Sequence, residues 1–295
     1  MRRLLATAAV AVGLTLGSAV PVGAAPLAPQ TTLYGLTRDN RVITFSSRLA
    51  VVPSRVVSVT GLQPGETLIG IDRRPKTGEI YAVGKLGTAG RLYTVNPQTG
   101  AATFVATLVS APTATSPGGT PIALSGTEFG FDFNPAADAL RITSDTAQNL
   151  RVIPSNRVPA TGPALKAGDT FTDGALNVGG TPATGVTGAG YTNSATSPSQ
   201  PATTTLYDLD TTRDLLVRQN PPNAGGLETV GPLGYPAGTS AGFDIVTTPA
   251  GEFAFAALTL ERYPVTVLFQ VDLTTGQARP IGVVNPAYTL RGITA

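Results

Sequence analysis

The sequence contains no histidine, no cysteine and no tryptophan. The absence of histidine and cysteine excludes disulfides, zinc sites built from these residues, haem histidine ligands, and nucleophile pairs of the Ser-His or Cys-His type. Any chemistry must therefore come from carboxylates, Arg, Lys, Tyr, hydroxyls or amides. Charge is also scarce, since Asp, Glu, Lys and Arg make up only 13% of the chain. With 20 basic against 18 acidic residues, the sequence lacks the positive charge that nucleic-acid binding requires.

Glycine and proline, in contrast, are abundant, with 34 and 25 of the 295 residues. This composition is typical of a chain with many turns between short strands. Beyond the N-terminal region, no window of about eleven residues keeps a helical period. We therefore expect an all-β protein.

Residues 1–24 predict a cleaved secretory signal peptide. Arg2 and Arg3 precede an apolar stretch, and Val22-Gly23-Ala24 places small residues before the expected cleavage site. Cleavage lowers the 20 basic residues to 18, equal to the 18 acidic ones, so the mature chain has no net charge. No second apolar stretch long enough to span a membrane follows. We expect a secreted monomer, extracellular or periplasmic, without a membrane span.

A short motif, glycine followed by an apolar residue and aspartate, recurs along the chain at intervals of about 50 to 60 residues. Each repeat unit also contains short runs rich in Val, Ile, Phe, Tyr and Thr, separated by turn residues. Four such runs in a unit of this length predict one blade of a β-propeller. The copies of the motif are Gly70-Ile71-Asp72, Gly130-Phe131-Asp132 and Gly242-Phe243-Asp244, with Gly190-Tyr191-Thr192 and Gly292-Ile293-Thr294 carrying threonine instead.

The positions of the units predict a five-bladed β-propeller. The run 290–294 has the pattern of an innermost strand, and three strand-like runs stand near the N-terminus without one. We expect this last strand to close the ring onto the N-terminal blade. A short tail, residues 25–30, would then precede a single domain, residues 31–295. The other four blades of the propeller would begin near residues 67, 127, 186 and 240. A β-sandwich with a second domain is the alternative.

The third unit departs from the apolar pattern of the others. Its stretch from Phe129 to Arg151, which includes the runs GFDFNP and SDTAQN, resembles a family of exported bacterial proteins, the domain-of-unknown-function family numbered 4394. Residues 189–194 and 206–210 share the resemblance, which covers roughly residues 31–294. The resemblance implies a propeller-like exported domain. It brings no assigned activity, so no catalytic residue is carried over from it.

Asp72, Asp132 and Asp244 are candidate metal ligands. If they stand on innermost strands, they form a ring with Thr192 and Thr294 at one end of the central channel. Three carboxylates and two hydroxyls offer the hard oxygen ligands that suit Ca²⁺ or Mg²⁺, and no other cofactor is expected. In the alternative interpretation, which the recurrence of the motif favours because a fold element repeats and a site usually does not, each aspartate only accepts backbone hydrogen bonds in the turn that follows it.

Polar side chains concentrate in the third unit, where the other units have apolar residues. Strand alternation puts Arg141 and Asp145 on one face, and a tight turn would bring Asn149 and Arg151 beside them. These groups suit a carboxylate or sugar hydroxyls, bound by bidentate hydrogen bonds. The alternative is a network that braces the blade, with Arg141 paired to Asp145. The candidate ligand-binding residues are Asp132, Arg141, Asp145, Asn149, Arg151, Tyr191 and Asn193.

Two longer segments, 110–120 and 154–189, are rich in Gly, Ala, Pro, Ser and Thr. We expect both to be surface loops that cover one face of the ring.

Two classes of function remain open. The first is a non-catalytic binding module for a glycan, a peptide or a partner protein of the cell envelope. The second is a carboxylate-dependent hydrolase, similar to a glycosidase, which needs two acids about 5–9.5 Å apart, one of them with a raised pKa. We favour binding, because most of the acidic residues stand at repeated turn positions. The first candidates for such acids are Glu128, Asp132, Asp145 and Asp244.

Overall fold

The computed structural model describes residues 27–49, 52–261 and 263–295. The predicted signal peptide, residues 1–24, lies outside the described residues. None of the described residues forms a helix long and apolar enough to cross a membrane.

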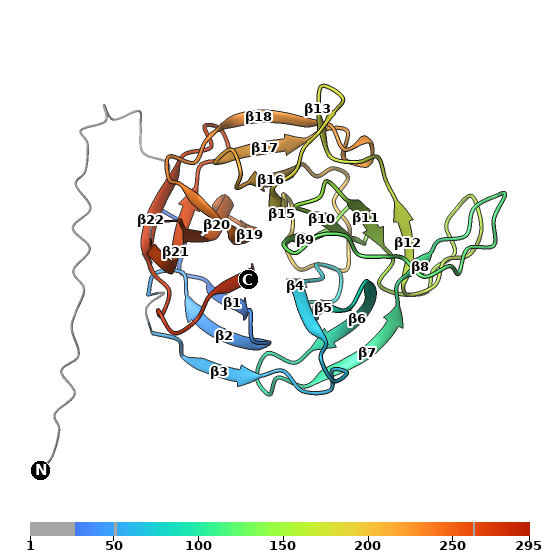
Figure 1. Ribbon diagram of the computed structural model, residues 1–295, viewed down its shortest axis with the longest axis horizontal. Helices are drawn as coiled ribbons and strands as arrows, with labels where there is room; N and C mark the ends of the chain where they lie inside the picture. Colours follow the sequence, from blue (N-terminus) through green and yellow to red (C-terminus); the bar gives the residue numbers. More distant parts are fainter. Residues whose placement is uncertain (1–26, 50–51, 262) are drawn as a thin grey trace, which may run out of the picture.

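The described chain forms five small sheets arranged as blades around a central axis (Figure 1). Blade 1 contains β23 (Leu290–Thr294), β1 (Thr32–Thr37), β2 (Arg41–Ser46) and β3 (Arg55–Ser58). Blade 2 contains β4 (Thr67–Arg73), β5 (Ile80–Leu86), β6 (Ala89–Val95) and β7 (Ala102–Thr107). Blade 3 contains β9 (Phe129–Asn134), β10 (Ala139–Ser144), β11 (Asn149–Val152), β12 (Asp169–Thr172) and β8 (Val109–Ser110). Blade 4 contains β15 (Val186–Tyr191), β16 (Leu206–Asp210), β17 (Leu215–Gln219) and β18 (Leu227–Pro232). Blade 5 contains β19 (Ala237–Thr248), β20 (Gly251–Leu260), β21 (Tyr263–Val271) and β22 (Ala278–Val283).

Little structure stands outside the blades. A hairpin of β13 (Asn177–Val178) and β14 (Thr181–Pro182) precedes blade 4, and one 3₁₀ turn spans Pro222–Ala224. The prediction of an all-β propeller with five blades is confirmed.

The ring is closed by the pairing of β23 with β1. The two strands run antiparallel, with Tyr34 opposite Thr294 and Gly35 opposite Ile293. Blade 1 therefore takes its innermost strand from the C-terminal end of the chain and its other strands from the N-terminal end, as predicted.

The recurring glycine of the motif allows the innermost strands to approach one another closely. A Cβ atom on Gly242 in β19 would lie 2.7 Å from the carbonyl carbon of Gly292 in β23, and a Cβ atom on Gly130 in β9 would lie 2.8 Å from that of Gly188 in β15. Such distances are too short for any side chain, so the repeat of glycine follows from crowding at the axis.

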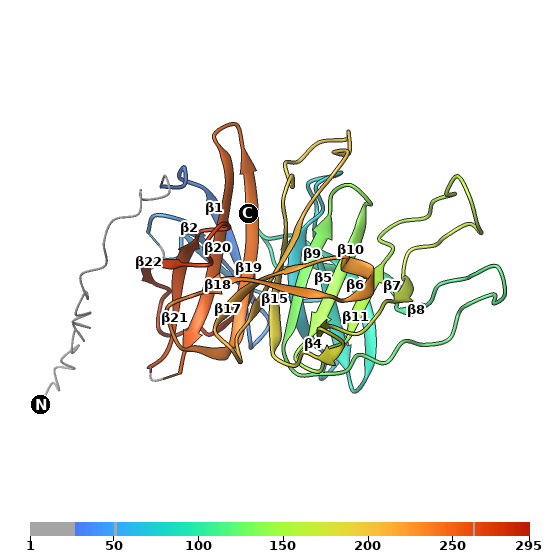
Figure 2. The same ribbon diagram turned by 90° about the horizontal axis from the view of Figure 1, so that it is seen from above.

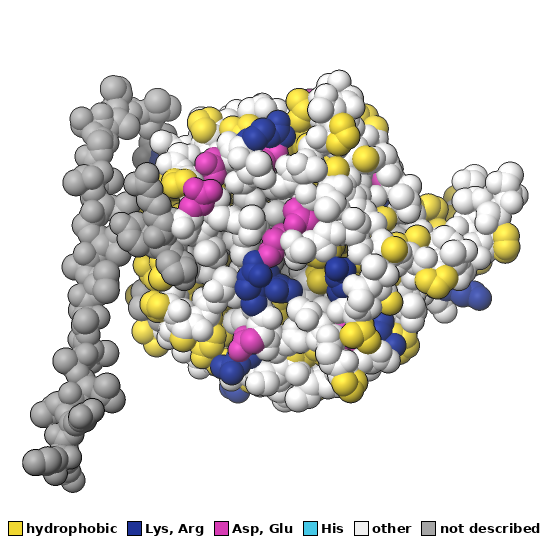
Figure 3. Space-filling model, in the orientation of Figure 1, with side chains coloured by type: hydrophobic (Ala, Val, Ile, Leu, Met, Phe, Trp, Pro, Cys, Tyr) yellow, Lys and Arg dark blue, Asp and Glu magenta, His cyan; other side chains and the backbone are white. Residues whose placement is uncertain are grey.

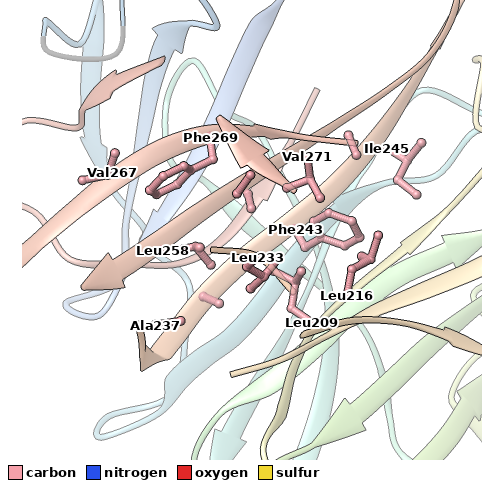
Figure 4. Packing of buried hydrophobic residues seen from close by; sticks show 14 residues of the cluster. Leu209, Leu216, Leu233, Ala237, Phe243, Ile245, Leu258, Val267, Phe269 and Val271 are labelled. Atoms are coloured by element: carbon pink, nitrogen blue, oxygen red, sulfur yellow. The ribbon is translucent and has the colours of Figure 1, made fainter. Parts of the chain in front are cut away.

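Apolar side chains from facing sheets fill the spaces between blades. Between blades 4 and 5, Phe243 of β19 faces Leu209 and Leu216 of blade 4, and Phe269 and Val271 of β21 extend the same cluster (Figure 4). A similar cluster joins blades 2 and 3. The stacking of blades thus buries the apolar face that each sheet alone would leave exposed.

The prediction for the segment 154–189 is wrong in part. Residues Asp169–Thr172 form β12, which pairs with β11 and so belongs to blade 3. The strand is short, and three of its four residues are polar, which is why it lacks a clear signal in the sequence. Residues near 112–120 and 158–164 are mostly exposed, and the loops beside β8 and β12 project from the rim of the ring (Figure 1).

Candidate functional site

Three aspartates converge at one end of the central channel. Asp72 on β4, Asp132 on β9 and Asp244 on β19 each occupy the same position of the repeated motif, near the axis. One carboxylate oxygen of each lies within 4.8 Å of the others, and all three side chains are buried. Strands of the same direction around one axis bring equivalent residues to the same height, so the repeat itself produces this triad.

The triad lies in a pocket of about 290 Å³ at the mouth of the channel. Hydroxyl groups predominate among the other side chains that surround it, and Tyr34 supplies one aromatic ring. Figure 3 shows the opposite face of the ring, where acidic and basic side chains lie next to one another near the centre. Besides the triad, the lining residues are Thr32, Tyr34, Arg73, Ser194, Ala195, Thr196, Ile245, Val246, Thr247, Thr294 and Ala295.

Burial raises the pKa of all three carboxyl groups. For Asp72 the charge of Asp244 adds to the effect of burial, and for Asp132 the charges of Asp72 and Asp244 do so. Burial raises the pKa of Asp244 to about 6. Three carboxylates at this spacing repel one another, so the triad holds protons more readily than isolated aspartates do.

The aspartates also connect neighbouring blades. The backbone N–H of Phe133 in blade 3 donates to Asp72 Oδ2 (2.7 Å), and the hydroxyl of Thr294 in blade 1 donates to Asp72 Oδ1 (2.8 Å). The backbone N–H of Ala295 donates to Asp244 Oδ2 (2.8 Å). These bonds cross between blades, whereas the alternative interpretation placed them in the turn after each aspartate.

The two threonines of the predicted ring differ in position. Thr294 reaches the triad through its bond to Asp72. Thr192 is instead engaged within blade 4, where its hydroxyl accepts from the backbone N–H of Thr205 (2.8 Å), and it does not line the pocket.

Arg73 and Tyr34 form one wall of the pocket. The guanidinium of Arg73 lies over the ring of Tyr34, 5.5 Å from its centroid. Its Nη1 donates to the carbonyl of Gly78 (2.7 Å), and its Nε donates to the carbonyl of Ala295. The positive charge is therefore fixed beside the three acids.

Most of the other predicted site residues lie in a separate network between blades 3 and 4. Arg141 is 1% exposed and donates to four groups from different segments. The acceptors are Asn149 Oδ1 (2.7 Å), Asp173 Oδ2 (2.7 Å), Asn223 Oδ1 (2.9 Å) and the hydroxyl of Tyr191 (3.3 Å). Such mutual hydrogen bonding corresponds to the bracing alternative, and ligand binding by these residues stays a prediction.

The predicted pairing of Arg141 with Asp145 is wrong. Asp173, at the end of β12, is the acid that binds both Arg141 and Arg151, the latter through Nε (2.6 Å) and Nη2 (3.0 Å). Asp145 turns toward the other end of the blade, where it accepts from the backbone N–H (3.0 Å) and the hydroxyl (2.7 Å) of Thr127.

The remaining candidates lie apart from the triad and from this network. Glu128 pairs with Arg38 near the opposite end of β9 from Asp132, and burial raises its pKa. Asn193 follows β15, in the connection that supplies Ser194, Ala195 and Thr196 to the pocket.

The sequence pattern did not indicate several residues of the triad pocket and of the network around Arg141. Asp173 and Asn223 lie in segments without a repeat signal, far along the chain from Arg141. Arg73 follows the motif aspartate in one unit only, and Tyr34 precedes the first complete unit. The repeat identifies groups that recur, and it carries no information on groups that a single blade adds.

The triad offers the donor set of a hard divalent cation. Carboxylate and hydroxyl oxygens are the ligands that Ca²⁺ and Mg²⁺ prefer, and a cation would stabilise the ionised form of all three acids. Their arrangement around one point in a pocket therefore fits such an ion.

Comparison with known proteins gives the family of the chain and several solved structures with low sequence identity to it. A search of the curated proteins finds no match. Among solved structures, the chain is similar to the glutaminyl cyclase of Myxococcus xanthus, with 12% identity over 87% of this chain and 97% of that chain, and a TM-score of 0.43. The corresponding values for a chain of the nidogen/laminin complex are 12%, 90%, 98% and 0.45. For a protein from Lactobacillus plantarum they are 16%, 87%, 67% and 0.35.

Similarities at this level say nothing about activity or ligand. The domain of unknown function DUF4394 matches residues 41–294. This range contains every strand of the five blades except β1. The chain therefore belongs to the DUF4394 family.

Proposed function

We propose that the protein is an exported binding module that holds a divalent cation, Ca²⁺ foremost, at the triad and recognises a small glycan through it. The observation that carries the proposal is the convergence of Asp72, Asp132 and Asp244 within 4.8 Å of one another in a pocket. An ion there would offer open coordination positions on its pocket side, which vicinal hydroxyls of a sugar suit.

The pocket wall favours a glycan over a peptide or an envelope protein. Hydroxyls of Thr32, Ser194 and Thr247 offer both donors and acceptors, and Tyr34 offers a ring for stacking. A pocket of about 290 Å³ lies just below the usual range for organic ligands, about 300–1,000 Å³. It suits the end group of a glycan.

Titration with Tb³⁺ tests the ion site. Terbium takes the place of calcium and becomes luminescent when a nearby tyrosine is excited, and the chain has no tryptophan that would compete. We expect one Tb³⁺ per chain, displaced by Ca²⁺. Asp132→Asn should weaken binding by more than about 100-fold, since loss of an outer-shell partner alone costs roughly 10–100-fold. Glu261→Gln, at an exposed position, is the matched control.

Glycan arrays probed with calcium and with EDTA test the ligand. Binding that depends on calcium and on Asp132 supports the proposal. Ion binding without any calcium-dependent glycan would overturn the glycan part of it, and equal affinity of Asp132→Asn and the unchanged protein for Tb³⁺ would overturn the ion site. Export is tested separately, because the secreted protein should begin at Ala25.

A hydrolase is the second candidate, since the triad also has features of an acid pair. Retaining glycosidases place two carboxyl groups about 5–5.5 Å apart, and here burial raises the pKa of Asp244 to about 6 and those of Asp72 and Asp132 well above their usual range. Chromogenic glycosides distinguish the two candidates. Turnover that survives EDTA and is abolished by Asp132→Asn would favour hydrolysis over ion-dependent binding.

A further inference from the structure

The connection between β15 and β16 crosses the mouth of the channel. We call its residues 193–197 the strap. At one end, the backbone N–H of Ser194 donates to the hydroxyl of Thr247 in blade 5 (2.7 Å), and the hydroxyl of Ser194 donates to the carbonyl of Ile245 (2.5 Å). At the other end, the backbone N–H of Ser197 donates to the carbonyl of Pro75 in blade 2 (2.9 Å).

The order of blades around the ring requires this crossing. The innermost strands contact one another in the order β23, β4, β9, β15 and β19, which returns to β23. Blade 2 is thus a neighbour of blades 1 and 3, whereas the strap begins in blade 4 and binds blade 5. A segment that touches blades 5 and 2 must pass over the axis between them. The β15–β16 connection projects from the same end of the ring as the β19–β20 hairpin (Figure 2).

The strap forms part of the pocket that contains the triad. Ser194, Ala195 and Thr196 line this pocket together with Asp72, Asp132 and Asp244. Because the strap lies across the mouth, an occupant that reaches the triad from this face has to pass beside it or displace it.

The strap is held more firmly at blade 5 than at blade 2. Glu252 of β20 accepts from the backbone N–H of Asn193 (3.1 Å) and from the hydroxyl of Thr247 (2.8 Å), which itself binds Ser194. On the side of blade 2, the Ser197 N–H to Pro75 carbonyl bond is the one hydrogen bond found among the described residues. Residues 198–200 beyond it are exposed. The end at blade 2 is therefore the more weakly held of the two.

We propose that the strap gates the triad, releasing first from blade 2, and that it restricts the ligand to the end group of a glycan. The inference rests on the proposed function and deepens it. In the closed position the roof of the pocket leaves room for an ion and one small group, and a chain that continued in both directions would collide with residues 194–196. Opening of the strap, which weaker anchoring at either end would speed, sets the rate at which the ion and its ligand exchange.

A reversible crosslink between the strap and blade 2 tests the gate. A Cβ atom at Gly78 would lie 3.3 Å from Cγ2 of Thr196, close to what a disulfide between these positions requires. The chain has no cysteine of its own, so Gly78→Cys combined with Thr196→Cys gives a single pair. Gly78 has a φ of +75°, and the reduced form of the same double variant therefore serves as the control for any strain.

The readout is the rate at which EDTA removes bound Tb³⁺ in a stopped-flow instrument. We expect the oxidised form to release Tb³⁺ at least about tenfold more slowly than the reduced form. Glu252→Ala, which removes two anchoring bonds, should speed release by roughly tenfold. Glu228→Ala, which removes an exposed carboxylate that binds Arg218 in blade 4, should leave the rate unchanged.

The outcomes separate the two proposals. Equal release rates in the oxidised form, the reduced form and Glu252→Ala, with Tb³⁺ binding intact, would overturn the gate and leave the ion site standing. Failure of the unchanged protein to bind Tb³⁺ would overturn the ion site and the gate with it. If the disulfide does not form, the rate of Tb³⁺ release from Glu252→Ala decides whether the strap gates the triad.

Discussion

Arg141 and Asp208 are both fully buried, but they differ in hydrogen bonding and in charge. Arg141 donates to four acceptors between blades 3 and 4. Neither carboxylate oxygen of Asp208, on β16, has a hydrogen-bond partner among the described residues. Burial raises the pKa of Asp208 to about 8, although the charge of Arg141 opposes the effect. Asp208 is therefore neutral at pH 7, whereas Arg141 keeps its charge and is surrounded by acceptors.

Removing Arg141 should cost far more stability than removing Arg151. Arg141→Ala leaves the buried acceptors on Asn149 and Tyr191 without this donor, and we expect a loss of roughly 3–5 kcal/mol. The side chain of Arg151 is 29% exposed, and Asp173 keeps Arg141 when Arg151 is lost, so Arg151→Ala should cost less than about 1 kcal/mol. Urea denaturation of both variants measures the difference.

Two results would contradict the bracing role. One is a denaturation midpoint of Arg141→Ala equal to that of the unchanged protein. The other is the loss of glycan binding in Arg151→Ala at unchanged stability, which would indicate that the network around Arg141 binds the glycan.

At the scale of the elements, the strands that repeat were predictable and those that do not repeat were not. The glycine-apolar-aspartate motif recurs because innermost strands such as β9 and β19 are crowded at the axis, and this recurrence predicted the number of blades. β12 has no counterpart in the motif, and its four residues lie in a segment of turn-like composition. The triad follows from the repeat, whereas the contacts of Asp173 and of the strap depend on the closure of the ring, which joins residues far apart in sequence.

The closing strand should be essential to the whole ring. Leu290 and Ile293 are buried against Leu33, Ile43 and Phe255, and deletion of residues 290–295 would expose this cluster and the edge of β1. We expect the truncated chain to show no cooperative thermal transition. The milder change Leu290→Ala should cost about 2–5 kcal/mol, while Val158→Ala, at a position that is 83% exposed, should stay within about 0.5 kcal/mol. A truncated chain that melts like the full one would contradict closure by β23.

At the scale of the whole molecule, buried acids with raised pKa values couple stability to pH. In the unfolded chain an aspartate has a pKa of about 3.9, so it loses its proton before the native carboxyl group does. Over the interval between the two pKa values the native state binds more protons than the unfolded state. The free energy of unfolding therefore falls as the pH rises through that interval.

Asp208→Asn isolates one such contribution. For Asp208 the interval runs from about 3.9 to about 8, and its slope is about 1.4 kcal/mol for each pH unit. The amide does not titrate, so the variant should resemble the unchanged protein near pH 4 and become progressively more stable than it up to pH 8. Unfolding in urea with EDTA present, at a series of pH values, measures the difference. Parallel curves for the two proteins would show that Asp208 ionises freely in the native state.

Blade 1 contains strands from residues 32–58 and 290–294. Because these two segments are synthesised first and last, the blade cannot be completed until the end of synthesis. While the chain is being synthesised, β1 can pair with β2, but its other edge has no partner until the other four blades have been made. During that time the unpaired edge is open to strands of other nascent chains. We infer that slow or interrupted synthesis between β4 and β23 favours aggregation. Blade 1 begins first and is completed last.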